Sequence, residues 1–232
     1  MMNNIALVVA LATAPSTAFA ELRERPRFWF PLVLLVVVSA VMVYWYYSTV
    51  DIEWLKDALF TNNPKFQQLP EAQRAATLSG VGRNIMLWGG VVATIVVLPI
   101  YFLLQSLYLL LAAKVTKLPQ GFKHWFAFSC WTALPTLLGS VVAAIFFLMG
   151  TNMQVGPGAL QPLSLNELVF HQPMGSPAQP LLETVGIPAF LIWILMILGV
   201  HSWSQRSWVF STIFVMLPVV VFYGIWALIA FR

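Results

Sequence analysis

Residues 84–113 read NIMLWGGVVATIVVLPIYFLLQSLYLLLAA, an apolar stretch without Asp, Glu, Lys, Arg or His. As an α-helix these residues would be about 45 Å long. The hydrocarbon core of a bilayer is only about 30 Å thick. The stretch therefore predicts a membrane-spanning helix that either tilts or protrudes from the bilayer.

Four other stretches are apolar and long enough to cross a bilayer, and they lack the same five residue types: 28–47, 125–149, 184–200 and 208–231. Of the 232 residues, 60% are hydrophobic and 9% are charged, which leaves too few charges to cover a soluble domain. We expect an all-α integral membrane protein with five transmembrane helices in one domain, 28–231, and an N-terminal interfacial helix.

The distribution of basic residues predicts the orientation. A cytoplasmic N-terminus places most Lys and Arg residues inside: Arg23, Arg25, Arg27, Lys114, Lys117, Lys123 and Arg206. The predicted outer loops are 48–83 and 150–183, and residues 150–183 contain neither Lys nor Arg. The C-terminus is then extracytoplasmic. The net charge of +4 fits contact with anionic headgroups, and we expect no nucleic-acid partner.

Residues 1–27 have two interpretations. Ala18-Phe19-Ala20 resembles a signal-peptidase site, but the preceding apolar run has no basic n-region and is interrupted by Pro15. We therefore expect a retained, cytoplasmic amphipathic segment along the membrane interface, with Arg23, Arg25 and Arg27 at headgroup level. A helix packed on the bundle is the alternative.

The two long connections differ in composition. Residues 51–83 predict two short amphipathic helices, the first with Ile52, Leu55 and Leu59 on one face and the second opening near Pro70. Residues 150–183 are rich in Gly and Pro and predict an irregular segment with a helical turn after Ser164. This segment either lies on the bundle, caps it or docks an extracytoplasmic partner.

Small hydroxyl residues in the third span recur at helical spacing, which predicts one row on a single helix face: Ser129, Thr132, Thr136 and Ser140. This row is either a polar groove for a headgroup or small solute, or a seam in which helices pack closely. A second patch of small residues is a candidate partner for the seam: Gly89, Gly90, Ala93 and Thr94. Gln105 needs a polar partner and should face the interior.

Every span contains a proline. Pro31 and Pro188 lie near expected helix starts, where the missing N–H costs little. Pro99, Pro135 and Pro218 lie in mid-span, where each should bend its helix and free a carbonyl that a neighbour must satisfy. These three prolines are either hinges around a cavity or static bends.

The spans offer no acid, base or charged group for catalysis or proton transfer. His124, His171 and His201 have no metal-binding spacing, the single cysteine is Cys130, and neither a nucleophile elbow nor a P-loop is present. We expect no metal, no cofactor and no enzymatic activity.

Three segments resemble members of the Yip family (Ypt/Rab-interacting protein family) of bacterial type. They are ATAPSTAFAELRERPRFWFPLVLL, YLLLAAKVTKLPQGFKHWFAFSCWTALPTLLG and IPAFLIWILMILGVHSWSQRSWVFSTIFVMLPVVV. The resemblance covers roughly residues 10–230 and rests on the order of prolines and aromatics within five spans. It implies a Yip-type membrane domain and a bacterial cytoplasmic (inner) membrane, and it supplies no catalytic residues. Rab binding is not implied, because the long N-terminal region of eukaryotic members is missing.

These features together predict a non-enzymatic membrane protein that binds or organises lipids or partner membrane proteins, including copies of itself. The alternative is a transporter or lipid-moving protein with a cavity between the proline-containing second, third and fifth spans.

Overall fold

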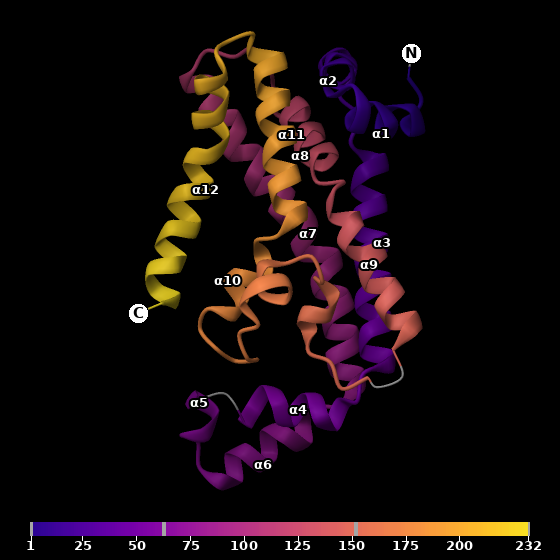
Figure 1. Cartoon of the computed structure of the whole chain (residues 1–232), viewed down its shortest axis with the longest axis vertical. Coiled ribbons are helices and arrows are strands. Elements are labelled where there is room, and N and C mark those ends of the chain that lie inside the picture. Colours follow the sequence, from indigo (N-terminus) through magenta and orange to yellow (C-terminus); the bar gives the residue numbers. More distant parts are fainter. Residues whose placement is uncertain (1, 62–63, 151–152, 232) are drawn as a thin grey trace. The chain divides into compact units, whose positions relative to one another are not determined.

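The computed structural model describes residues 2–61, 64–150 and 153–231, which are mainly helical and contain no strand (Figure 1). Five segments are long and apolar enough to cross a membrane, as predicted: α3 (Trp29–Thr49), α7 (Arg83–Val115), α8 with α9 (Phe122–Met149), α11 (Ile187–Ser204) and α12 (Trp208–Ala230). Pro31 and Pro188 lie in the first turns of α3 and α11, where the missing N–H is tolerated.

The third span, Phe122–Met149, is interrupted near Pro135, where the sequence predicted a bend. It consists of α8 (Phe122–Thr132) and α9 (Thr136–Met149), joined by a tight turn. Pro135 has no N–H to give to the Trp131 carbonyl, which instead accepts from Leu134 N at 3.3 Å. The proline therefore interrupts this span, whereas α7 and α12 continue past Pro99 and Pro218.

Shorter helices flank the spans: α1 (Asn4–Thr13), α2 (Pro15–Glu24), α4 (Ile52–Thr61), α5 (Pro64–Gln67), α6 (Glu71–Gly80), η1 (Pro157–Leu160), η2 (Asn166–Phe170) and α10 (Gln179–Thr184). The helices α4 and α6 confirm the two predicted between residues 51 and 83, with Pro70 just before α6. The Ser164 hydroxyl accepts from the Glu167 N–H at 3.3 Å and so caps the turn η2, also as predicted.

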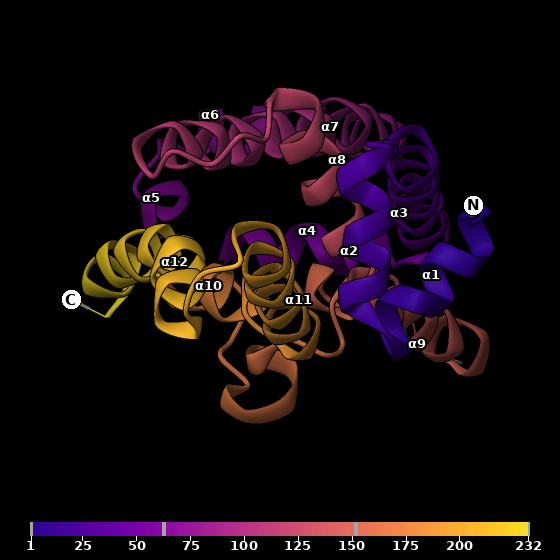
Figure 2. The same ribbon diagram turned by 90° about the horizontal axis from the view of Figure 1, so that it is seen from above.

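The chain divides into two compact units, each assembled from distant segments. Unit 1 comprises residues 1–36, 97–136 and 189–225. Its core is aromatic, with Phe19, Trp125, Phe128 and Trp203 buried together. All residues of α8 from Trp125 to Thr132 are buried, so this helix is enclosed by protein rather than by lipid. Figure 2 shows α2 beside α8 at this core.

Unit 2 comprises residues 37–96, 137–188 and 226–232. The second half of α3 packs there against α9, with Tyr46 and Phe147 in contact. Ile52 and Leu55 on α4 are buried in the same cluster and Leu59 packs against it, which confirms the predicted apolar face. We call the end of unit 2 that carries the connections 50–82 and 150–186 the long-loop end.

Candidate functional site

The polar residues of unit 1 form a seam between α7 and α8. The Ser106 hydroxyl of α7 lies 2.5 Å from the Phe102 carbonyl oxygen and 3.1 Å from the Ser129 hydroxyl of α8. Ser106 and Ser129 are both fully buried. Each hydroxyl therefore has a protein partner at a place where an unpaired one would cost about 1–3 kcal/mol.

The predicted hydroxyl row is divided at the break in the third span. Ser129 and Thr132 belong to α8 and are fully buried, with Thr132 donating to the Phe128 carbonyl at 2.9 Å. Thr136 begins α9, is exposed, and donates to the Ala133 carbonyl at 2.8 Å. Ser140 lies further along α9, in unit 2. The structure thus joins Ser129 with Ser106 and does not align the four hydroxyls on one helix.

Gln105 precedes Ser106 on α7 and is half-buried. Its side-chain amide lies 3.6 Å from the Met196 sulfur of α11, within unit 1. A thioether sulfur is a weak acceptor, so this contact orients the amide towards a neighbouring helix. Gln105 therefore faces another span, as expected for an amide in lipid surroundings.

The small-residue patch on α7 packs against α3, whereas the sequence predicted the hydroxyl row of the third span as its partner. A Cβ placed on Gly90 would lie 3.0 Å from atoms of Val43 and of Tyr47, both on α3. A Cβ on Gly89 would meet nothing within 4 Å. The patch thus permits close packing of α7 on α3 in unit 2. The residue of α7 that faces Ser129 is Ser106, and not a member of the patch.

Aromatic side chains satisfy carbonyls that two prolines leave without a helical partner. In a helix, Pro31 and Pro218 cannot donate to the carbonyls of Arg27 and Phe214, four residues earlier. The Trp131 indole N–H donates to the Arg27 carbonyl at 2.6 Å. The Tyr108 hydroxyl donates to the Phe214 carbonyl at 3.0 Å. Both contacts lie within unit 1 and connect α8 with the start of α3, and α7 with α12.

The N-terminal helices have a buried face and an exposed face. Phe19 and Leu22 are fully buried in the core of unit 1, and the Phe19 carbonyl accepts from the Trp203 indole N–H at 2.8 Å. This face fits the alternative of a helix packed on the bundle. Ile5 and Val9 on α1 are 71% and 55% exposed, so the opposite face is available to the membrane interface.

The predicted headgroup-level arginines have different surroundings. Arg27 is half-buried, and its guanidinium donates to the Met2 carbonyl at 2.7 Å and to the Glu21 carboxylate at 3.1 Å. These contacts connect the start of α1 with the entry to α3. Arg23 and Arg25 are exposed.

The remaining candidate groups are held by packing. His124 contacts Trp203 edge to face, and His201 stacks on Trp208 with centroids 3.8 Å apart. Cys130 is fully buried. Across residues 2–61, 64–150 and 153–231, no group of three or more His, Cys, Asp or Glu side chains is placed to hold a metal ion.

Sequence reasoning missed the donors that connect these elements: Tyr108, Trp131, Trp203 and Arg83. The Arg83 guanidinium donates to the carbonyls of Tyr47 and Val50 at 2.6 and 2.9 Å and so caps the end of α3. The mid-span position of Pro218 did indicate that a carbonyl in its helix would need a donor. The sequence contains no comparable indication of which aromatic residue provides it.

The fold is that of the class of multi-pass α-helical membrane proteins. Here a polar seam between α7 and α8 has its hydroxyl groups bonded within the protein. The family model described as the Yip1 domain matches residues 9–229, nearly the whole chain. The chain belongs to this family, which confirms the resemblance seen in its sequence. No curated protein and no solved structure matches the chain.

Proposed function

We propose that this Yip1-family chain is a non-enzymatic membrane protein that acts through its lipid-facing surface, by binding or organising lipids or partner membrane proteins. One observation carries the proposal. The buried hydroxyls of Ser106, Ser129 and Thr132 bond to each other and to backbone carbonyls, so they are used in packing. A substrate pathway would need such groups to face a solute.

The outward surface of the spans supports the same proposal. On α7, Val92, Val97 and Leu104 are between 57% and 62% exposed. Apolar side chains at such positions suit acyl chains or the helices of another membrane protein. Cys130 on α8 is fully buried in unit 1, which favours a structural role over a catalytic one.

The transporter alternative has weaker support. Two of the three mid-span prolines, Pro99 and Pro218, lie in continuous helices, and the carbonyl freed by Pro218 is occupied by Tyr108. A moving gate would have to break that hydrogen bond in each cycle. A static bend requires no such change.

The proposed location is a bacterial cytoplasmic membrane, with the N-terminus inside and the C-terminus outside. Support comes from exposed cations of unit 1, which gather on its N-terminal segment and short connections: Arg23, Arg25, Lys114, Lys117, Lys123 and Arg206. A cysteine replacing Ala76 in α6 tests the orientation, because it should react with an impermeant maleimide added to intact cells. Reaction only after lysis would reverse the assignment.

Native mass spectrometry of the purified protein tests the function. We expect retained phospholipid or a second copy of the chain at low collision energy. Arg23→Gln should reduce the anionic phospholipid retained, whereas Lys56→Gln removes the same charge from α4, where Lys56 pairs with Glu53 at 3.0 Å, and should not. A chain observed only as a bare monomer at the lowest collision energy would contradict the proposal.

A further inference from the structure

The long-loop end of unit 2 has a recognisable water boundary. Helix α3 ends at Thr49, and Asp51 follows. The Asp51 carboxylate accepts from the Gln154 side chain at 3.0 Å and from the Trp54 N–H at 3.1 Å, and these hydrogen bonds hold its pKa below the usual value. The Asp51 N–H donates to the Met153 carbonyl at 3.1 Å. A charged carboxylate thus places Met153 at the edge of the membrane.

The chain after Met153 returns towards the middle of the spans. The Val155 carbonyl accepts from the Tyr46 hydroxyl at 2.9 Å, about one helical turn inside the end of α3. At the other end of the segment, Pro188 lies 3.9 Å from a Cβ placed on Gly139. Gly139 precedes the last residue of α9, Met149, by ten residues, or about 15 Å of helix. In Figure 1, α10 accordingly lies at the height of α9 rather than beyond its end.

The middle of the segment is held at the level where α11 begins. Leu165 N donates to the Val185 carbonyl at 2.7 Å, and Ile187 N donates to the Leu163 carbonyl at 3.0 Å. Gly186 permits this pairing, because a Cβ there would collide with the Leu163 carbonyl. Non-helical backbone at membrane depth requires such internal partners.

The turn η2 exposes three apolar side chains, and Glu167, which is exposed as well, has its carboxylate beside Gly158 of η1. Leu168, Val169 and Phe170 are 46%, 60% and 49% exposed. A Cβ on Gly158 would collide with the carboxylates of Glu167 and Glu183, so both acids point towards η1.

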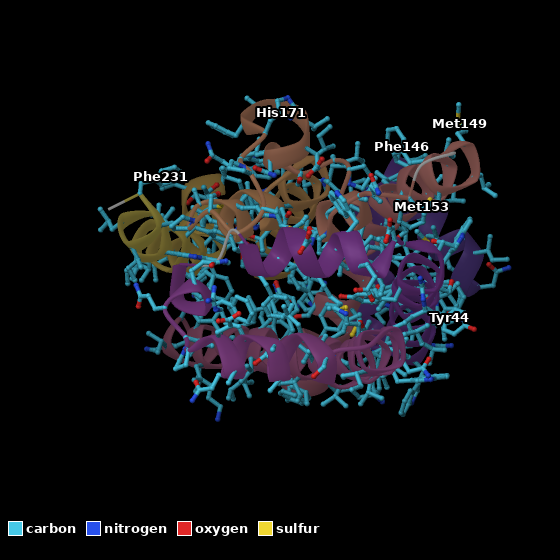
Figure 3. All side chains as sticks on the ribbon, turned by 90° about the horizontal axis from the view of Figure 1, so that it is seen from below. Tyr44, Phe146, Met149, Met153, His171 and Phe231 are labelled. Atoms are coloured by element: carbon cyan, nitrogen blue, oxygen red, sulfur yellow. The ribbon has the colours of Figure 1, made fainter. Side chains whose placement is uncertain are left out.

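We propose that residues 155–186 form a re-entrant segment whose tip, Leu168–Phe170, contacts lipid acyl chains in the leaflet at the long-loop end. The depth of this segment in the membrane indicates that lipid is the molecule in contact with the tip. The segment lies beside α9, whose Phe146 and Met149 are exposed apolar residues at the margin of unit 2. Figure 3 shows both of them there, with His171, the neighbour of the tip, also at the margin. The proposed position of residues 155–186 in the membrane does not depend on the proposed function.

Fluorescence quenching in proteoliposomes tests the proposal. The full-length Cys130→Ala protein would carry one new cysteine, labelled with bimane in detergent and then reconstituted with phospholipids brominated on their acyl chains. The variants are Val169→Cys at the tip, Val141→Cys on the exposed face of α9 as the membrane control, and Ala76→Cys on exposed α6 as the water control. We expect quenching at residue 169 close to that at residue 141, and little quenching at residue 76.

A second measurement uses unlabelled protein and an impermeant maleimide. Apolar surroundings raise the pKa of a thiol, and each unit lowers the reactive thiolate about tenfold, so residue 169 should react at least about tenfold more slowly than residue 76. Fast reaction and no quenching at residue 169 would overturn the proposal. Slow reaction without quenching would also overturn it, because a protein segment rather than lipid would then cover the tip.

Discussion

At the scale of single residues, hydrogen-bond satisfaction accounts for the packing of unit 1. In hydrocarbon, water is not available to a carbonyl that a proline has freed. Tyr108 supplies a donor from α7 to the Phe214 carbonyl, so the bend at Pro218 has a fixed contact. A hydrogen bond therefore holds the bend at Pro218, which is why we favour a static bend over a hinge there.

A double-mutant cycle tests this interpretation. Tyr108→Phe keeps the ring but leaves the Phe214 carbonyl without the hydroxyl, which should lower stability by about 1 kcal/mol. In a Pro218→Ala background, the introduced alanine can donate its own backbone N–H to the Phe214 carbonyl, so the same change should cost close to nothing. Thermal unfolding in detergent gives both values. An equal loss in the two backgrounds would show that the hydroxyl does not compensate for the proline.

At the scale of elements, close approach at Gly199 fixes the N-terminal helices. Phe19 of α2 and Phe128 of α8 meet at Gly199 of α11, where a Cβ would lie 2.8 Å from the Phe19 ring and would collide with Phe128. Trp203, one turn later, donates to the Phe19 carbonyl. The residues around the apparent cleavage site, Ala18 and Phe19 among them, are thereby part of the core of unit 1.

Gly199→Ala should therefore destabilise the protein by about 1–3 kcal/mol, because overpacking displaces the Phe19 ring. The matched control is Gly89→Ala on α7, where the new methyl group meets nothing and should add up to about 1 kcal/mol of helix stability. Unfolding temperatures in detergent, with protease sensitivity of residues 14–27, measure both. Gly199→Ala that is as stable as the control, with no new cleavage, would show that α2 is not held in this way.

The sequence predicted the elements well where hydrophobicity alone decides. The five spans, the apolar face of Ile52, Leu55 and Leu59, and the cap at Ser164 all follow from local patterns. A bend at Pro135 was predicted, but not that this proline alone of the three would interrupt its helix, because Pro99 and Pro218 occupy similar apolar surroundings and leave their helices continuous. Which proline interrupts a helix depends on the neighbouring helices, and that information is not local. The pairing of Ser129 with Ser106, rather than with Gly90, has the same cause.

At the scale of the whole molecule, buried polar groups that bond to one another contrast with exposed apolar side chains on the spans. In unit 1, α8 is buried and its hydroxyls form hydrogen bonds within the protein. The spans expose aliphatic side chains. We propose that a protein built in this way acts through its surface. Its proposed partners are therefore molecules of the membrane itself, lipids and other membrane proteins, rather than solutes carried through it.

Water access to residue 129 shows whether the seam between α7 and α8 is closed to water. In a Cys130→Ala background, Ser129→Cys places a thiol in the seam between α7 and α8, and Ala76→Cys provides an exposed comparison of the same chemistry. We predict that a small hydrophilic thiol reagent, added to proteoliposomes, modifies residue 76 within minutes. The same reagent should leave residue 129 unmodified until the protein is unfolded. Modification of residue 129 at a rate similar to that of residue 76, in protein that remains folded, would reveal an aqueous pathway and favour the transporter instead.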